Sequence, residues 1–164
     1  FHAVREQAST GVDILSVTCL ITSVGDDGVR RFMLGLRAPT THRYGGLWEF
    51  GPAGAVDAPP GPTTLSPEDL IGEARREARE ETGLEFDGDR AVLWGLLFDD
   101  AVGSVDIIVR IELDEIPLPE TNWEYKGVRW ASASELREWS RTRPGTLIPP
   151  ARAIIERLDR DAYP

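Results

Sequence analysis

The sequence predicts an α/β protein in which helices cover the faces of a mixed β-sheet. Apolar segments of strand-like composition fall into two groups, and a strongly helical segment separates the groups. Two further helical segments end the chain, an order typical of a mixed sheet with helices packed on it. The length of 164 residues predicts one domain, residues 1–164, with a substantial core.

The first group of strands is expected before residue 55. Its segments are rich in Val, Ile, Leu, Thr and Phe, which favour a pleated, buried environment. Glycine-rich stretches separate the segments and indicate tight turns. The expected strands cover residues 14–24, 32–37 and 47–50, with turns at residues 25–28 and 51–54.

The central helix carries boundary signals at both ends. Ser66 can cap it with its hydroxyl, Pro67 suits its first turn, and Gly83 can end it in the left-handed conformation. Its expected buried side is formed by Leu70, Ile71, Ala74 and Ala78. Residues 58–65 contain several prolines and predict a surface loop.

The second half of the chain supplies the second group of strands and the last helices. Strands are expected over residues 91–98, 105–113 and 128–131. Ser132 and Glu135 match a capping box that opens a helix through about Arg141. A final amphipathic helix is expected from Ala151 to about Asp159.

Composition limits the partners and the compartment. The net charge of −10 disfavours nucleic acid or an anionic membrane as the main partner, because both attract basic surfaces. No apolar run approaches the ~20 residues that span a bilayer. The single cysteine, Cys19, lies in an apolar segment and predicts a buried thiol and a reducing, cytoplasmic location.

The central helix concentrates negative charge on one side. Glu77, Glu80 and Glu81 are spaced i, i+3 and i+4, so they are neighbours on a helix surface. Their mutual repulsion is relieved by a hard divalent cation such as Mg²⁺ or Mn²⁺, which prefers oxygen ligands. Arg76 lies four residues from Glu80 and can orient a carboxylate. The alternative is a solvated acidic helix face without a ligand.

This segment resembles the signature of the Nudix hydrolases, G-x5-E-x7-R-E-U-x-E-E-x-G-U, where U is a bulky apolar residue. The fixed positions match from Arg76 to Leu84, except that Ala78 is small. Glu68 has the spacing of the first signature glutamate, although an N-terminal acid on a helix dipole explains it equally well. Gly54 matches the opening glycine only with an eight-residue insertion, because 13 residues separate it from Glu68 where the signature has five.

A second stretch supports the resemblance. Members of the family often carry W-x-x-P-G-G before the signature helix, and this chain has Trp48-Glu49-Phe50-Gly51-Pro52-Ala53-Gly54. The resemblance implies an α/β/α sandwich that cleaves a nucleoside diphosphate linked to another moiety, by attack of water on phosphorus. It also implies a small, nucleotide-type substrate and a bound Mg²⁺ or Mn²⁺ ion.

The resemblance assigns roles by position. Glu77, Glu80 and Glu81 are the expected metal ligands, and Arg76 orients them. The catalytic base varies in position within the family, and Glu124 is the first choice here. The other candidates for the base are Glu120, Asp99 and Asp100. Phosphate contacts are expected from Arg37, His42 or Arg43, and Trp48 or Tyr44 can stack on a base; for all five a structural role is the alternative. The positions of Gly54 and Glu68 in the signature place them at the substrate site as well.

Two other functions remain open at this stage. The altered turn at residues 51–54 and the insertion favour a nucleotide-binding or regulatory domain that has lost turnover. An isomerase acting on an isoprenoid diphosphate would need a reactive cysteine or acid, and Cys19 in a strand is poorly suited. The sequence leaves the substrate, the number of metal ions and the oligomeric state, including a homodimer, undetermined.

Overall fold

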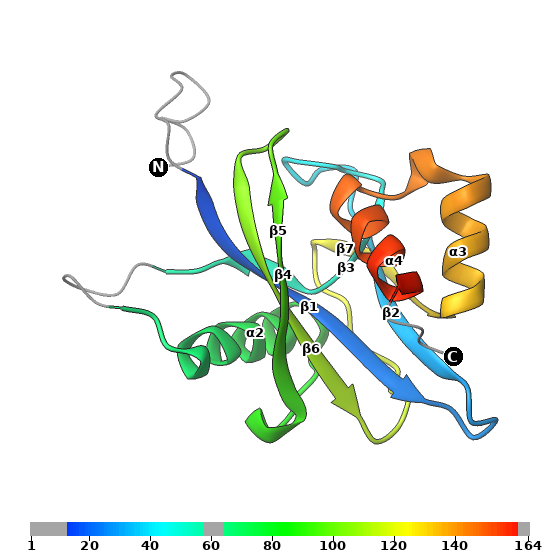
Figure 1. Cartoon of the computed structure of the whole chain (residues 1–164), viewed down its shortest axis with the longest axis horizontal. Coiled ribbons are helices and arrows are strands. Elements are labelled where there is room, and N and C mark those ends of the chain that lie inside the picture. Colours follow the sequence, from blue (N-terminus) through cyan, green and yellow to red (C-terminus); the bar gives the residue numbers. More distant parts are fainter. Residues whose placement is uncertain (1–12, 58–63, 161–164) are drawn as a thin grey trace.

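The computed structural model describes residues 13–57 and 64–160, and it confirms the α/β class. A seven-stranded mixed sheet has α2 on one face and α3 and α4 on the other (Figure 1). The strands are β1 (Ile14–Val24), β2 (Arg30–Arg37), β3 (Trp48–Phe50), β4 (Ala53–Ala55), β5 (Ala91–Asp99), β6 (Ser104–Leu113) and β7 (Tyr125–Ser132). The α-helices are α2 (Pro67–Thr82), α3 (Ala133–Thr142) and α4 (Pro149–Arg160), with short 3₁₀ turns at Gly88–Arg90 and Pro144–Thr146.

Strand β1 organises the sheet. The strand order is β3-β2-β1-β6-β5, with β4 also pairing with β1 and β7 also pairing with β2. The pairing of β1 with β6 is parallel and runs from Ile14 opposite Ser104 to Ser23 opposite Leu113. All the other strand pairs are antiparallel. The crossover that the parallel pair requires contains α2.

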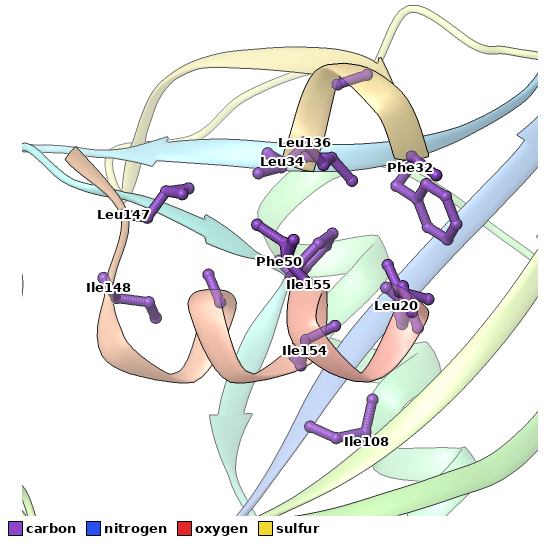
Figure 2. Close-up of a cluster of buried hydrophobic side chains, with 14 residues drawn as sticks. Leu20, Phe32, Leu34, Phe50, Ile108, Leu136, Leu147, Ile148, Ile154 and Ile155 are labelled. Carbon is purple, nitrogen blue, oxygen red and sulfur yellow. The ribbon is translucent and has the colours of Figure 1, made fainter. Parts of the chain in front are cut away.

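The two faces of β1 belong to two different cores. Val17, Cys19 and Ile21 point toward α2, whereas Leu20 points toward α3 and α4. This alternation follows from the period of two in a strand, and the near-continuous apolar sequence reflects burial on both faces. Figure 2 shows Leu20 among the apolar side chains of β2, β3, α3 and α4.

The predicted boundaries of α2 are confirmed. Ser66 caps the helix in a capping box with Asp69, and Gly83 ends it in the left-handed conformation with φ 66°. Ala74 and Ala78 are fully buried against the sheet, and Ile71 is only partly buried. The predicted capping box of α3, Ser132 with Glu135, is also confirmed.

Several boundaries differ from the sequence prediction. Residues 53 and 54 were expected in a turn, but together with Ala55 they form β4, because these three residues pair with Ser16, Val17 and Thr18 of β1. Strand β7 starts at Tyr125 instead of Val128, because β2 is long enough to pair with it there. Helix α4 starts at Pro149, two residues earlier than expected.

Two predicted segments lie wholly or partly outside the described residues. These are the chain start over residues 1–11 and most of the loop over residues 58–65. Within the ranges that the structure describes, no helix is long and apolar enough to cross a membrane.

Candidate active site

Two glutamates of α2 are buried against the sheet. Glu77 and Glu81 stand one helical turn apart, and 7% and 5% of their surfaces are exposed. Strand β4 makes room for them with Gly54: a Cβ built on Gly54 would lie 2.0 Å from Oε1 of Glu77. The missing side chain at Gly54 therefore creates the space that the Glu77 carboxylate fills. Glu80 is different, because 54% of its side chain is exposed.

Arg76 joins the carboxylates of α2. Its Nη2 donates to Oε1 of Glu77 at 2.7 Å, and its Nη1 donates to Oε2 of Glu80 at 3.1 Å. Nη2 also donates to Oε2 of Glu73 at 2.8 Å, a partner that the sequence analysis did not single out. The hydrogen bond to Glu73, together with the charges of Glu77 and Glu80, raises the pKa of the Arg76 guanidinium. The guanidinium thus partly neutralises the acidic face.

Glu81 meets Glu124 from the segment that precedes β7. Burial raises the pKa of the Glu81 carboxyl well above its ordinary value, and a hydrogen bond with Glu124 raises it further. Two carboxylates form such a bond only when one of them holds a proton. Burial also raises the pKa of Glu77. Oε2 of Glu81 is buried without a hydrogen-bond partner, so a positive group is needed before both carboxylates can ionise.

A further buried carboxylate lies close by on β3. Glu49 is 3% exposed, and its Oε1 accepts hydrogen bonds from Nη1 of Arg37 at 2.6 Å and from Oη of Tyr125 at 2.9 Å. Its charge adds to the rise in the pKa of Glu81. The sequence analysis missed Glu49 and Tyr125, although a glutamate between Trp48 and Phe50 in an apolar strand was a usable signal.

A cleft of about 230 Å³ opens beside Glu49 and Gly54. Its other polar lining residues are Ser16, Thr18, Arg37, Arg43, Tyr44, Ser104, Asp99 and Asp106. The hydroxyl of Tyr44 donates to Oδ2 of Asp99 at 2.8 Å and connects the loop after β2 to the end of β5. The cleft lining thus combines two guanidinium groups with the carboxylates of Glu49, Asp99 and Asp106.

The structure brings some of the predicted site residues together and leaves others apart. Glu77 lies against Gly54 and is bound by Arg76, and Glu81 contacts Glu124. Glu80 is bound by Arg76 at the exposed side of this acidic group, and Arg37 contacts Glu49. Arg43, Tyr44 and Asp99 line the cleft, and Asp100 lies exposed in the turn after Asp99. Glu120 lies beside Gly83 at the end of α2.

Two predicted substrate-binding residues are distant from the acidic group. Glu68 is exposed in the first turn of α2, nine residues and therefore about 13 Å of helix before Glu77. Trp48 stacks edge-to-face on Trp139, with ring centroids 5.3 Å apart. The two rings line a separate groove of about 520 Å³, which contains none of the α2 glutamates. His42 is exposed in the loop after β2.

The donor set fits a hard divalent cation in chemistry. Among the described residues, no group of three or more His, Cys, Asp or Glu side chains is spaced to hold a metal ion as it stands. The guanidinium of Arg76 instead pairs with Glu77 and Glu80. A bound Mg²⁺ or Mn²⁺ ion would nevertheless give Oε2 of Glu81, which has no hydrogen-bond partner, a cation to bind. It would also reduce the repulsion between the buried carboxylates. Glu77, Glu80 and Glu81 would supply oxygen ligands, and Glu80 would exchange its ion pair with Arg76 for the cation.

Comparisons with known proteins identify the fold. No family model matches the sequence, and no curated protein matches it. Among solved structures, a Nudix hydrolase from Alicyclobacillus acidocaldarius is 15% identical with a TM-score of 0.73, covering 91% of each chain. The Nudix domain of Shewanella oneidensis NrtR, complexed with ADP ribose, is 15% identical with a TM-score of 0.67, covering 98% of each chain.

A third structure is a bifunctional NMN adenylyltransferase/ADP ribose pyrophosphatase from Francisella tularensis, complexed with AMP and a manganese ion. It is 18% identical with a TM-score of 0.65, over 97% of this chain and 44% of that one. At these identities, the likeness establishes the architecture of the chain.

Proposed function

The chain has the Nudix hydrolase fold, and we propose that it is a metal-dependent pyrophosphohydrolase. Its substrate would be a nucleoside diphosphate linked to another moiety, cleaved by attack of water on phosphorus. The observation that carries this proposal is the acidic group formed by the buried Glu77 and Glu81 and the partly buried Glu124. Gly54, which lies against Glu77, also lines the cleft together with Arg37 and Arg43. A surface acidic helix face would need neither the burial nor the cleft.

The ligands of structural neighbours support a nucleotide-type substrate. The Shewanella domain was solved with ADP ribose, and the Francisella protein with AMP and manganese. A cleft of about 230 Å³ is large enough for part of such a molecule. We therefore propose Mg²⁺ or Mn²⁺ as the cofactor and a nucleotide-linked metabolite as the substrate.

The residues of this chain would divide the work as follows. Glu77, Glu80 and Glu81 would hold the cation, which supplies charge neutralisation at phosphorus and a more acidic water. Arg76 holds Glu77 and Glu80 in place through its hydrogen bonds. Glu124, adjacent to Glu81, would accept the proton of the attacking water. Most of the remaining catalysis is positioning and electrostatics, as in phosphoryl transfer generally.

One observation favours a second function. Arg76 binds the very carboxylates that a cation would need, as it would in a domain that binds a nucleotide without turning it over. In that case, Glu81 and Glu124 would share a proton permanently, and the cleft would serve recognition alone. This alternative predicts nucleotide affinity that does not depend on Mg²⁺.

A hydrolysis screen separates the two functions. The screen uses ADP-ribose, nucleotide sugars, dinucleoside polyphosphates and nucleoside triphosphates, each with and without Mg²⁺. The pyrophosphohydrolase proposal expects Mg²⁺-dependent release of a nucleoside monophosphate or diphosphate and incorporation of oxygen from labelled water into one product. Tight nucleotide binding by calorimetry without any turnover would instead support the binding domain.

A further inference from the structure

Three buried side chains from three strands meet next to the acidic group. Arg37 ends β2, Glu49 lies in β3, and Tyr125 starts β7. Oε1 of Glu49 accepts from Arg37 at 2.6 Å and from Tyr125 at 2.9 Å. We call these three residues the Glu49 brace. Glu49 and Tyr125 are each 3% exposed, so both hydrogen bonds lie in a region of low dielectric, where they are strong.

Two glycines make room for the brace. A Cβ on Gly35 would lie 2.3 Å from Cε1 of Tyr125, and a Cβ on Gly51 would lie 2.3 Å from its hydroxyl oxygen. The tyrosine therefore occupies space that any other residue at Gly35 or Gly51 would fill. Gly35 lies against the ring of Tyr125, Gly51 lies against its hydroxyl group, and this hydroxyl donates to Glu49.

The brace is connected to Glu124 through the backbone. Tyr125 directly follows Glu124 in the chain. Ala38, which directly follows Arg37, also binds Glu124, because its amide donates to the carbonyl of Glu124 at 2.6 Å. The amide of Glu124 donates to Oδ1 of Asn122 at 2.7 Å. Both main-chain polar groups of Glu124 are thus fixed, and the pairing register between β2 and β7 shifts at this point. The direction of the Glu124 side chain depends on where the brace holds the start of β7.

The guanidinium of Arg37 forms its hydrogen bonds within the protein. Its Nε donates to the carbonyl of Arg43 at 3.0 Å, and its Nη1 donates to Glu49. Only 19% of its side chain is exposed. Removing one member of a buried ion pair leaves the other charge uncompensated, so Arg37 and Glu49 depend on each other.

We propose that Arg37, Glu49 and Tyr125 are positioning residues that hold Glu124 against Glu81, and that Arg37 acts through Glu49. This inference rests on the proposed function only for its effect on turnover. The brace itself determines the relative position of the Glu81 and Glu124 carboxylates. The affinity of the site for a cation measures this position directly, without any substrate. Supporting residues around metal ligands commonly change metal affinity by ~10–100-fold when altered.

The first test deletes one hydroxyl. Tyr125→Phe keeps the ring between Gly35 and Gly51 and removes the hydrogen bond to Glu49. The control is Thr22→Val, which removes a fully buried hydroxyl, distant from the cleft, that donates to the carbonyl of Ile111 and accepts from Nη1 of Arg30. Thr22→Val loses two hydrogen bonds and Tyr125→Phe loses one, so the melting temperature of the control should fall at least as far.

The two variants should differ in two other measurements. Tyr125→Phe should weaken Mn²⁺ binding, measured by electron paramagnetic resonance of free Mn²⁺, by ~10-fold or more, and Thr22→Val should not. On the best substrate of the screen, Tyr125→Phe should lower kcat by at least ~10-fold with little change in KM. If both variants bind Mn²⁺ equally well, the brace is only structural and the proposal is overturned. If the wild type binds Mn²⁺ without hydrolysing any substrate, the proposed function fails while the Mn²⁺ result still decides the brace.

A second test asks whether Arg37 acts through Glu49, and it also serves if Tyr125→Phe does not fold. Arg37→Gln, Glu49→Gln and the double variant form a thermodynamic cycle on Mn²⁺ affinity and on kcat/KM. If the brace is one unit, the double variant should be no worse than the worse single variant. Independent, additive losses would mean that Arg37 contacts the substrate directly, and would overturn this part of the proposal.

Discussion

Oε1 of Glu77 lies so close to Gly54 that no side chain fits between β4 and α2 at this position. The two residues are 23 positions apart in sequence, and the antiparallel pairing of Gly54 with Val17 holds β4 there. The carboxylate of Glu77, an expected metal ligand, therefore occupies space that is open only because Gly54 has no side chain. This relationship gives the most local test of the site.

Gly54→Ala should displace Glu77 without unfolding the protein. The predicted contact of 2.0 Å involves the flexible end of Glu77, which can move at low cost. Mn²⁺ affinity should fall by ~10-fold or more, because one ligand is moved. The control is Gly72→Ala on α2, the helix that carries Glu77, where a Cβ meets nothing within 4 Å. Gly72→Ala should raise stability by about 0.5–1 kcal/mol and leave Mn²⁺ binding unchanged. Equal Mn²⁺ affinities in the two variants would contradict the role of Gly54.

Mg²⁺ should stabilise the wild-type protein through the acidic face. A ligand that binds only the folded state raises the melting temperature in proportion to the logarithm of its concentration. The variant with Glu77→Gln, Glu80→Gln and Glu81→Gln should lose this rise. A control with the same charge change alters three exposed glutamates elsewhere, Glu85, Glu115 and Glu156. The assignment is wrong if all three proteins respond equally to Mg²⁺ in scanning calorimetry.

Glu81→Gln should reduce turnover far more than it weakens substrate binding. The amide keeps the shape of the carboxylate and removes its charge, and losing one electrostatic element of this kind costs ~10²–10³ in rate. Glu77→Gln and Glu80→Gln should follow closely. Steady-state hydrolysis, paired with a melt in EDTA, separates this effect from unfolding. Near wild-type turnover in all three variants would exclude the hydrolase proposal.

Without divalent cations, the stability of the protein should fall as the pH rises. The pKa of Glu81 is raised in the folded state, so the folded protein retains a proton that the unfolded chain releases above about pH 4.5. The stabilisation is fully present below that value and is lost as the pH rises toward the folded-state pKa. Urea unfolding in EDTA from about pH 5 to about pH 9 should show this decline. Glu81→Gln should flatten it, and an unchanged slope would mean that Glu81 ionises freely in the fold.

The cysteine should be unreactive in the folded protein. Cys19 is fully buried between β1 and α2, as the sequence predicted, and its thiol donates to the carbonyl of Ala74. Burial, with the charges of Glu81 and Glu77, raises the pKa of the thiol, so very little thiolate forms. A maleimide should label the protein only in denaturant, as measured by mass spectrometry. Rapid labelling of the native protein would show that α2 opens frequently.

Local signals predicted the elements well, because they depend only on neighbouring residues. The cap at Ser66, the end at Gly83 and the capping box at Ser132 are all set within four residues of sequence. The same locality explains why the bond of Arg76 to Glu80 could be expected from helical spacing. These parts of the site are properties of α2 alone.

The remaining parts depend on contacts between elements and could not be obtained in this way. Whether Glu80 is exposed and Glu77 buried depends on where β4 lies, and β4 itself was mistaken for a turn. The contact of Glu124 with Glu81 depends on the starting point of β7, which is set by its pairing with β2. The role of Glu49 appears only when Arg37 and Tyr125 are placed around it.

The number of residues between Gly54 and the cap at Ser66 can vary without moving the residues at either end. One end is fixed by the pairing of β4 with β1, and the other by the hydroxyl of Ser66, so neither end depends on the number of residues between them. The entropy of closing a loop grows only with the logarithm of its length, and a doubling costs about 0.6 kcal/mol. Insertions here can therefore accumulate almost without selection against them, while Gly54 and Glu77 still meet. A motif defined by fixed spacing will miss such chains, and a search for a glycine facing a helix glutamate in space will find them.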